Sequence, residues 1–409
     1  MAAKQDNTSD LTGQSQCSYE ALPIWERFAQ AGTQLWIDAN DCNTIEKYWT
    51  HVFSGIDVHQ IGLEFELSPE TSGQVIPTIM QKIQPSGTSA DSVQQILSKL
   101  QIQLGLYMVQ RFKTRVVVAI YAANVHDVEK IMDFARQACD YCPKQFIINI
   151  PWSPGGLLAA RKLRWQGIAV MITQVFSARQ SYIAARLAQP AFVNMSLTPL
   201  HDVVLKNQLG GGLYVGEKAL LASQRTIKKL RHKEHLQTYQ VASGFTDGCQ
   251  LQNVTGVDVM SLSPHVIEDY LSLPIEGKTV FDRTDYDYMP LLNRNVDLGS
   301  QRFESLWQID DTHIACMDKL LQEDLDSIAP EDLVSFGYNA GCEDLFVTWK
   351  AEERGFSQKE GPIPDLNHWA TDLSRMRIGL DTLLNFAGLN ALTKVQAELE
   401  RHIAKTCAK

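Results

Sequence analysis

The sequence predicts an α/β protein: a (β/α)8 TIM barrel with an additional C-terminal helical segment. Eight short apolar runs alternate with longer amphipathic stretches along the 409 residues. Several runs are β-branched and nearly continuous, as in Val116-Val117-Val118, which is typical of parallel strands buried on both faces. Eight strand–helix repeats favour a closed barrel. An open doubly wound sheet would have fewer strands and a Gly-rich first turn, which is absent here.

The predicted strands are the eight apolar runs themselves. They are Gln34–Asp38, Gln60–Glu66, Arg115–Tyr121, Gln145–Ile150, Ala169–Phe176, Ala191–Leu197, Thr238–Phe245 and Asp258–Ser263. The stretches between them have apolar residues at helical spacing, most clearly over Asp127–Ala138. Leu157–Trp165 and Arg179–Leu187 follow the same pattern, so we expect a helix after each of these strands.

Three regions are expected along the chain. Residues 1–20 are polar and rich in Ser, Gln and Thr, which predicts a disordered N-terminal tail. Residues 21–350 would form the barrel, and residues 351–409 a C-terminal helical extension. Within this extension, Gly355–Asp365 is interpreted as a linker and Asn367–Ala408 as two helices broken at Ala387–Asn390.

One apolar stripe of the extension has a predicted packing partner. The segment Asp372–Leu384 would be helical, with Leu373, Met376, Leu380, Leu383 and Leu384 near one face. We expect this face to pack on the barrel, on residues 301–350 or on a second subunit. A homo-oligomer formed through the C-terminal helices is therefore one expected arrangement.

Composition narrows the class of partner. A formal net charge of −10 argues against a nucleic-acid binder, which usually carries a basic face. No apolar run approaches the ~18 residues of a membrane helix, and the N-terminus does not resemble a signal peptide. The eight cysteines are scattered, which favours a reducing, cytoplasmic setting. The Cys139/Cys142 pair has no second pair, so we expect no metal and no cofactor, only a small-molecule substrate.

Polar residues at the strand ends are the candidate functional residues, because chemistry in a closed barrel takes place at the C-terminal ends of its strands. The candidates are Asp38, Glu64, Glu66, Tyr121, Asn149, Ser153, Thr173, Asn194, Ser196 and Ser243. The alternative for any single hydroxyl is a local bond to the backbone. The set contains acids, amides and hydroxyls but no lysine or arginine. Such a pocket suits a neutral or cationic ligand better than a phosphorylated one.

Four segments resemble the transaldolase family. Asn149–Leu163 is similar to that family's Lys-Ile-Pro-Ala-Thr strand end and the helix after it, and Thr173–Ser177 to its Thr-Leu-Val-Phe-Ser. Leu35–Asn40 resembles the first strand of the family and Val241–Phe245 the seventh. The resemblance covers roughly residues 30–350 and implies a class I aldolase-type barrel active in carbohydrate metabolism.

The resemblance also implies that key family residues are replaced. The family's lysine forms a Schiff base with a ketose, and Asn149 stands at its position. An amide cannot form an iminium ion. Ala119 stands at the position of the family's proton-relay glutamate. Thr198 or Pro199, and Thr246, stand where two arginines bind substrate phosphate. Asp38, Thr173, Ser153 (for a threonine) and Ser243 keep the family's pattern.

Three functions are compatible with this reading. The first is a diverged lyase, isomerase or cyclase acting on a non-phosphorylated polar or carbonyl substrate, with specialised metabolism as a setting. Asp38 with Glu64 or Glu66 would then transfer protons, and Tyr121 and Asn149 would donate hydrogen bonds to a developing oxyanion. The substrate contacts would come from Glu66, Ser153, Thr173, Asn194, Ser196 and Ser243.

The other two functions retain the barrel fold but do not involve a diverged lyase, isomerase or cyclase reaction. One is a non-catalytic binding or scaffold protein, a pseudoenzyme whose C-terminal helices form an interface. The other is residual transaldolase activity with a lysine from elsewhere, such as Lys113 or Lys144. Both lysines precede predicted strands and would lie at the wrong end of the barrel.

Overall fold

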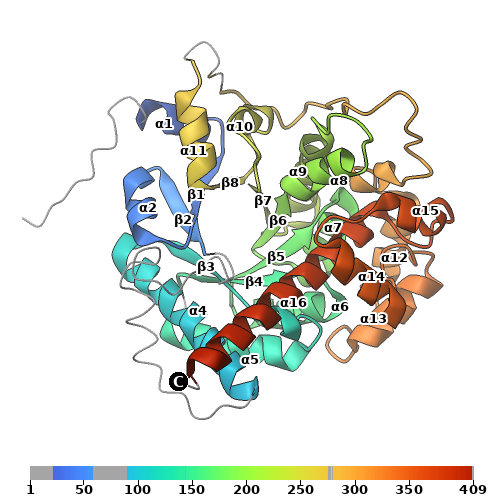
Figure 1. Cartoon of the computed structure of the whole chain (residues 1–409), viewed down its shortest axis with the longest axis horizontal. Coiled ribbons are helices and arrows are strands. Elements are labelled where there is room, and N and C mark those ends of the chain that lie inside the picture. Colours follow the sequence, from blue (N-terminus) through green and yellow to red (C-terminus); the bar gives the residue numbers. More distant parts are fainter. Residues whose placement is uncertain (1–21, 59–89, 143, 275–277, 279, 408–409) are drawn as a thin grey trace, which may run out of the picture.

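Eight parallel strands close into a barrel in the order of the sequence, which confirms the predicted fold class (Figure 1). The computed structural model describes residues 22–58, 90–142, 144–274, 278 and 280–407. The strands are β1 (Gln34–Asp38), β2 (Phe53–Asp57), β3 (Arg115–Ala119), β4 (Phe146–Pro151), β5 (Val170–Val175), β6 (Phe192–Ser196), β7 (Tyr239–Ser243) and β8 (Val259–Leu262).

The second strand differs from the prediction. It is Phe53–Asp57, which pairs with β1 on one side and with β3 on the other, so the barrel is complete without residues 60–66. The predicted strand Gln60–Glu66, with Glu64 and Glu66, lies outside the described residues. The error has a physical cause: Ser54 and Gly55 interrupt the apolar pattern of β2, and Gly is depleted in strands. The other seven strands lie where they were predicted, with ends shifted by at most two residues.

Helices cover the outside of the barrel. They are α1 (Leu22–Gln30), α2 (Cys42–Tyr48), α4 (Ala90–Phe112), the 3-10 turn η1 (Ala122–Asn124), α5 (Val128–Tyr141), α6 (Pro154–Trp165), α7 (Ala178–Ile183) with its π-helical continuation η2 (Ala184–Ala188), α8 (Thr198–Lys206), α9 (Val215–Glu234), α10 (Cys249–Asn253) and α11 (Pro264–Ser272). Side-chain hydrogen bonds cap the N-termini of several helices. Asp127 accepts a hydrogen bond from the backbone amide of Lys130 at the start of α5, and Ser153 accepts one from the backbone amide of Gly156 at the start of α6.

A helical segment follows the barrel. It consists of η4 (Phe303–Leu306), α12 (Asp311–Leu320), α13 (Pro330–Asn339), α14 (Ala351–Glu360), α15 (Leu366–Ser374) and α16 (Leu380–Cys407). Two predictions about it are wrong. Most of the expected linker Gly355–Asp365 belongs to α14. The expected break at Ala387–Asn390 lies inside α16, which is continuous.

The apolar stripe predicted over Asp372–Leu384 is divided between two helices. Between α15 and α16 the chain turns at Met376, which adopts a left-handed backbone conformation and is exposed. Leu373, Leu380, Leu383 and Leu384 are buried in the main core. The stripe thus packs within the chain, and contact with a second subunit stays a prediction.

The helix α16 crosses the barrel face beside β5, between α14 and α4 (Figure 1). A buried ion cluster anchors its first turn. Arg179 bonds to Asp381 with Nη2–Oδ1 2.6 Å and Nε–Oδ2 2.8 Å, and to Asp344 with Nη1–Oδ2 2.7 Å. Ser177 Oγ donates to Asp381, and His313 Nε2 lies 3.0 Å from Arg179 Nη1. The barrel and the C-terminal segment therefore share charged core residues.

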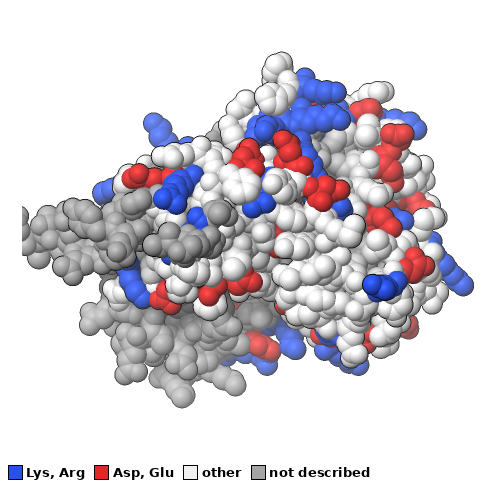
Figure 2. Space-filling model, turned by 90° about the horizontal axis from the view of Figure 1, so that it is seen from above, with Lys and Arg blue, Asp and Glu red and all other residues white. Residues whose placement is uncertain are grey.

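Acidic and basic side chains lie among one another on the face drawn in Figure 2, with several Lys and Arg side chains gathered near its upper edge. The basic run Lys228–Lys233 ends α9, where Arg231 forms a two-pronged ion pair with Asp258. Among the described residues, no helix has the length and apolar character needed to cross a membrane.

Candidate active site

The barrel interior contains two successive layers of side chains. The lower layer is apolar: Trp36, Val117, Ile147, Met171, Phe192, Val241 and Val259 form one buried cluster. Side chains two positions further along a strand point to the same face. The next layer is therefore Asp38, Asp57, Ala119, Asn149, Thr173, Asn194, Ser243 and Ser261. Seven of its eight members are polar, so the barrel core changes from apolar to polar within one strand repeat.

Gly55 completes the lower layer at β2. A Cβ atom at this position would lie 2.7 Å from Nε1 of Trp36. The glycine thus makes room for the indole, which lies edge-on to Phe192 at a centroid distance of 4.9 Å. This large aromatic pair closes the barrel below the polar layer.

A cavity of about 250 Å³ lies at the C-terminal ends of the strands. The polar side chains that line it are Asp38, Asp57, Asn149, Thr173, Gln174, Asn194, Ser196 and Ser243. Six of the residues predicted from the sequence are in this set: Asp38, Asn149, Thr173, Asn194, Ser196 and Ser243. No lysine or arginine lines the cavity within the described part of the chain.

Two amides in the cavity are oriented by hydroxyl groups. Thr173 Oγ1 donates to Asn149 Oδ1 at 2.6 Å, and Ser243 Oγ donates to Asn194 Oδ1 at 2.8 Å. Each amide oxygen is thereby occupied. The Nδ2 groups of both amides have no hydrogen-bond partner among the described residues, so their N–H donors are available to a ligand.

Two carboxylates lie next to each other on the opposite side of the barrel. Asp38 ends β1 and Asp57 ends β2, and the two residues are partners in the strand register. Adjacent strands are about 4.8 Å apart, so the two carboxylates lie within reach of one small ligand. Both residues are buried and line the cavity.

The helix α16 supplies part of the cavity wall. Leu392 lines the cavity, and Asn385 Nδ2 donates to the carbonyl groups of Trp152 and Gln174. Gln174 has a positive φ of 57°, and its Oε1 atom would lie 2.2 Å from a Cβ atom at Gly388. A glycine in the middle of α16 thus allows close approach of the helix to the cavity.

Asp57 and Leu392 are two of the lining residues that the sequence analysis did not name as candidates. Asp57 was overlooked because the second strand was predicted at Gln60–Glu66, since Ser54 and Gly55 interrupt the apolar pattern of Phe53–Asp57. Leu392 carries no local signal, since nothing in an ordinary leucine of a helix indicates that it reaches a cavity on another part of the chain.

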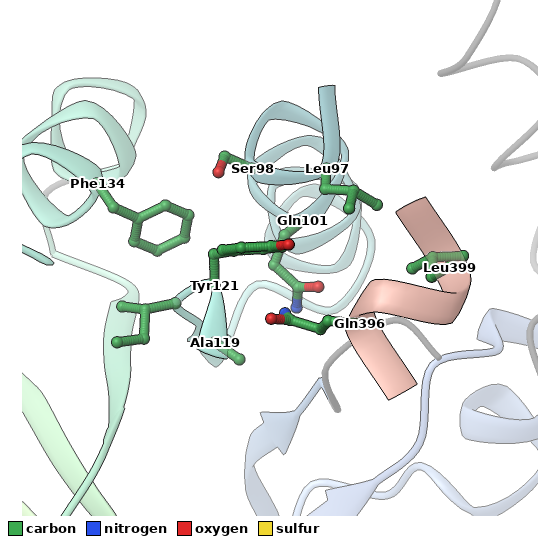
Figure 3. A pocket seen from close by; sticks show the side chains of 9 residues that line it. Leu97, Ser98, Gln101, Ala119, Tyr121, Phe134, Gln396 and Leu399 are labelled. Atoms are coloured by element: carbon green, nitrogen blue, oxygen red, sulfur yellow. The ribbon is translucent and has the colours of Figure 1, made fainter. Parts of the chain in front are cut away.

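Two predicted site residues lie elsewhere. The chain leaves the strand after Ala119, and the Tyr121 side chain packs between α4, α5 and α16 beside Phe134 and Gln101 (Figure 3). It faces a space of about 20 Å³, roughly enough for one water molecule. Ser153 caps α6 and donates to the Val125 carbonyl at 2.7 Å, so its hydroxyl is used structurally.

The alternative lysines lie at the other end of the barrel. Lys113 precedes β3 and Lys144 precedes β4, whereas the cavity lies at the ends of these strands. Within the described ranges no group of three or more His, Cys, Asp or Glu side chains is placed to hold a metal ion. The polar side chains that line the cavity can offer hydrogen bonds and proton transfer.

A closed (β/α)8 barrel with a polar cavity at the C-terminal strand ends defines the class of this protein. Residues 71–327 match the sequence model of the Transaldolase/Fructose-6-phosphate aldolase family, and the chain belongs to that family. The matched range begins after β2, so the first two strands are assigned to the barrel by the structure.

The chain is similar to transaldolases over a large part of its length. It is 25% identical to the transaldolase of Chlamydia muridarum over 259 residues, which cover 61% of this chain and 77% of the relative. The transaldolase of Chlamydia trachomatis is 24% identical over the same coverage. A shorter match of 66 residues, 39% identical, links the chain to a probable transaldolase of Desulfatibacillum aliphaticivorans, with 16% of this chain and 30% of the relative covered.

Proposed function

We propose that this chain is a diverged enzyme that acts on a small, non-phosphorylated carbonyl or polyhydroxy compound without a Schiff base. The observation that carries the proposal is the composition of the polar layer. It combines two carboxylates with two amides whose oxygens are already occupied, and its described members include no amine. Such a set binds hydroxyl groups through the carboxylates and a carbonyl oxygen through the amides.

Proton abstraction next to a carbonyl group is the reaction that these groups serve. The Nδ2 donors of Asn149 and Asn194 hold the substrate carbonyl oxygen and stabilise the negative charge that it gains. Asp38 or Asp57 accepts the proton from the neighbouring carbon, which leaves an enolate. Where the neighbouring carbon carries a hydroxyl group, its O–H proton moves to the former carbonyl oxygen and the abstracted proton returns to the former carbonyl carbon, which completes an isomerisation. In a lyase reaction the carboxylate instead removes the proton of a hydroxyl group on the second carbon from the carbonyl. The bond between the first and second carbons then breaks, a new carbonyl forms at the second carbon, and the electron pair of the broken bond gives the enolate, which is then protonated.

Proton exchange tests this proposal directly. The protein is incubated in D2O with a panel of non-phosphorylated ketoses and aldoses, and deuterium at the carbon beside the carbonyl is followed by NMR. We expect exchange on at least one member of the panel. Asp38→Asn and Asp57→Asn should each be assayed, and loss of the general base should lower the rate about 100-fold or more.

The control is Asp311→Asn, which removes an exposed carboxylate outside the cavity. Its exchange rate should equal that of the wild-type protein. Exchange that survives in both cavity variants would contradict the proposed roles. Binding of a panel member without any exchange would instead support the non-catalytic alternative.

A further inference from the structure

A second and larger cavity lies between the barrel and the C-terminal helices. Its volume is about 610 Å³, within the ~300–1,000 Å³ of small-molecule sites. The barrel contributes the segments that follow β3 and β4, and the C-terminal segment contributes α13, α14, α16 and residues 345–349. This cavity is separate from the one at the strand ends, and the two share α16 as a wall.

Four aromatic side chains line the second cavity: Trp152, Phe346, Trp349 and Phe386. Trp349 and Phe386 are stacked at a centroid distance of 3.8 Å and an angle of 6°, and Trp152 lies 5.7 Å from Phe346. An aromatic ligand could extend these contacts, since offset and edge-on ring pairs are favourable.

Two lining side chains carry buried polar atoms that a ligand could satisfy. Nε1 of Trp152 and Oγ1 of Thr382 have no hydrogen-bond partner among the described residues, and both residues are less than 5% exposed. A buried donor without a partner costs free energy, so a ligand acceptor here would be stabilising.

Opposite charges stand among the lining residues. Arg354 projects from α14 and Glu331 from α13, and neither has an ion-pair partner among the described residues. Neighbouring charges are paired, as in Glu353 with Arg377. His126 also lines the cavity. Its pKa is lowered by desolvation and by the charge of Arg354.

We propose that this cavity binds an aromatic zwitterion, a compound of the aromatic amino acid class. Its ring packs among Trp152, Phe346 and the Trp349–Phe386 stack. Its carboxylate lies at Arg354, where a guanidinium can form a two-pronged hydrogen bond, and its ammonium group lies at Glu331.

Calorimetry with four related probes tests the proposal. L-Tryptophan carries both charges, indole-3-propionate only the negative one, tryptamine only the positive one, and indole neither. We expect L-tryptophan to bind most tightly, with a dissociation constant below about 1 mM. Arg354→Met should weaken the binding of L-tryptophan and of indole-3-propionate about tenfold and leave the affinity for indole unchanged. Glu331→Gln should weaken the binding of L-tryptophan and tryptamine only.

Matched variants control for position. Arg375→Met removes an exposed arginine that does not line the cavity and should leave every affinity unchanged. Ser335→Trp fills the cavity from an exposed position on α13 and should abolish binding, whereas Asn339→Trp on the same helix should not. Asp57→Asn should also have no effect, which separates this site from the strand-end cavity. Equal affinity for all four probes, no binding of L-tryptophan, or equal effects of Arg354→Met and Arg375→Met would overturn the proposal.

Discussion

Thr173 Oγ1 donates a 2.6 Å hydrogen bond to Asn149 Oδ1 across the β4–β5 pair, inside the barrel cavity. The bond joins two residues of the polar layer and fixes which end of the amide can meet a ligand.

Removing this hydroxyl should lower both stability and ligand binding. In Thr173→Val the half-buried Asn149 Oδ1 loses its donor, which should cost about 0.5–1.5 kcal/mol of unfolding free energy. Urea denaturation measures this difference. The control, Thr371→Val at an exposed position, should change stability by less than about 0.5 kcal/mol. Equal effects of the two variants would mean that the bond does not contribute.

Schiff-base chemistry should be absent. Asn149 supplies an amide whose nitrogen lone pair is delocalised, and no lysine lines the cavity in the described part of the chain. Borohydride added with dihydroxyacetone or fructose 6-phosphate should therefore leave the protein mass unchanged in mass spectrometry. A reduced adduct on any lysine would restore the residual-transaldolase alternative.

Restoring a lysine alone should yield little transaldolase turnover. Asn149→Lys breaks the bond to Thr173, and its register partner on β3 is Ala119, which cannot relay a proton. Turnover is followed with fructose 6-phosphate and erythrose 4-phosphate. Asn194→Lys, at another amide of the same layer, serves as the matched variant and should be equally inactive. Robust turnover in Asn149→Lys would show that the cavity is closer to that of a transaldolase than we infer.

Phosphorylated sugars should bind no better than their parent sugars. The cavity holds Asp38 and Asp57 and, among its described lining residues, no cation. A charge-assisted bond contributes about 1.5–3 kcal/mol, so a site without two such bonds loses several powers of ten in phosphate affinity. Calorimetry with fructose 6-phosphate, and with fructose as the control, should show no low-micromolar binding. Tight, salt-sensitive binding of the phosphate would contradict this reading.

Stability should fall at acid pH through the Arg179 cluster. Burial raises the pKa of Asp344, but the adjacent Arg179 guanidinium outweighs it and holds that pKa below its usual value. A carboxylate with a lowered folded-state pKa stabilises fully above its unfolded pKa of about 3.9, and this contribution is lost as the pH falls toward the folded value.

Urea unfolding between pH 7 and pH 3 measures this effect. Asp344→Asn should be less stable than the wild-type protein at pH 7, by about 3–5 kcal/mol for a broken buried pair, and its stability should vary less below pH 4. Asp311→Asn, which removes an exposed carboxylate, should keep the wild-type pH profile. If the unfolding free energy of Asp344→Asn fell with pH as steeply as that of the wild-type protein, the acid sensitivity would have to come from other groups.

The polar layer was largely predictable because strand periodicity is local. Once β1, β4, β5, β6 and β7 are placed, every second residue faces inward, and Asp38, Asn149 and Thr173 follow. Asp57 was not predicted as a site residue because Gly55 obscures the second strand in the sequence. Gly55 weakens the strand pattern because it leaves room for Trp36, and this packing requirement lies in a different strand.

The C-terminal helices show the same limit of local reasoning. Gly388 predicts a helix break, yet α16 continues through it because the glycine lets the helix approach Gln174. Arg179 and Asp381 form their ion pair at a separation of 202 residues, so no short segment of the sequence contains both partners. Such long-range pairs follow from the packing of whole elements and are not encoded in any short window.

The ion pair that anchors α16 also sets an order of events during synthesis. Arg179 is made 202 residues before Asp381. Its other carboxylate partner, Asp344, lies 165 residues after it. At roughly 5–20 residues per second, the guanidinium is made on the order of 10–40 seconds before both carboxylates are present. Burying an unpaired charge is costly, so we expect the end of β5 to stay hydrated until the segment that carries Asp344 and Asp381 has been made.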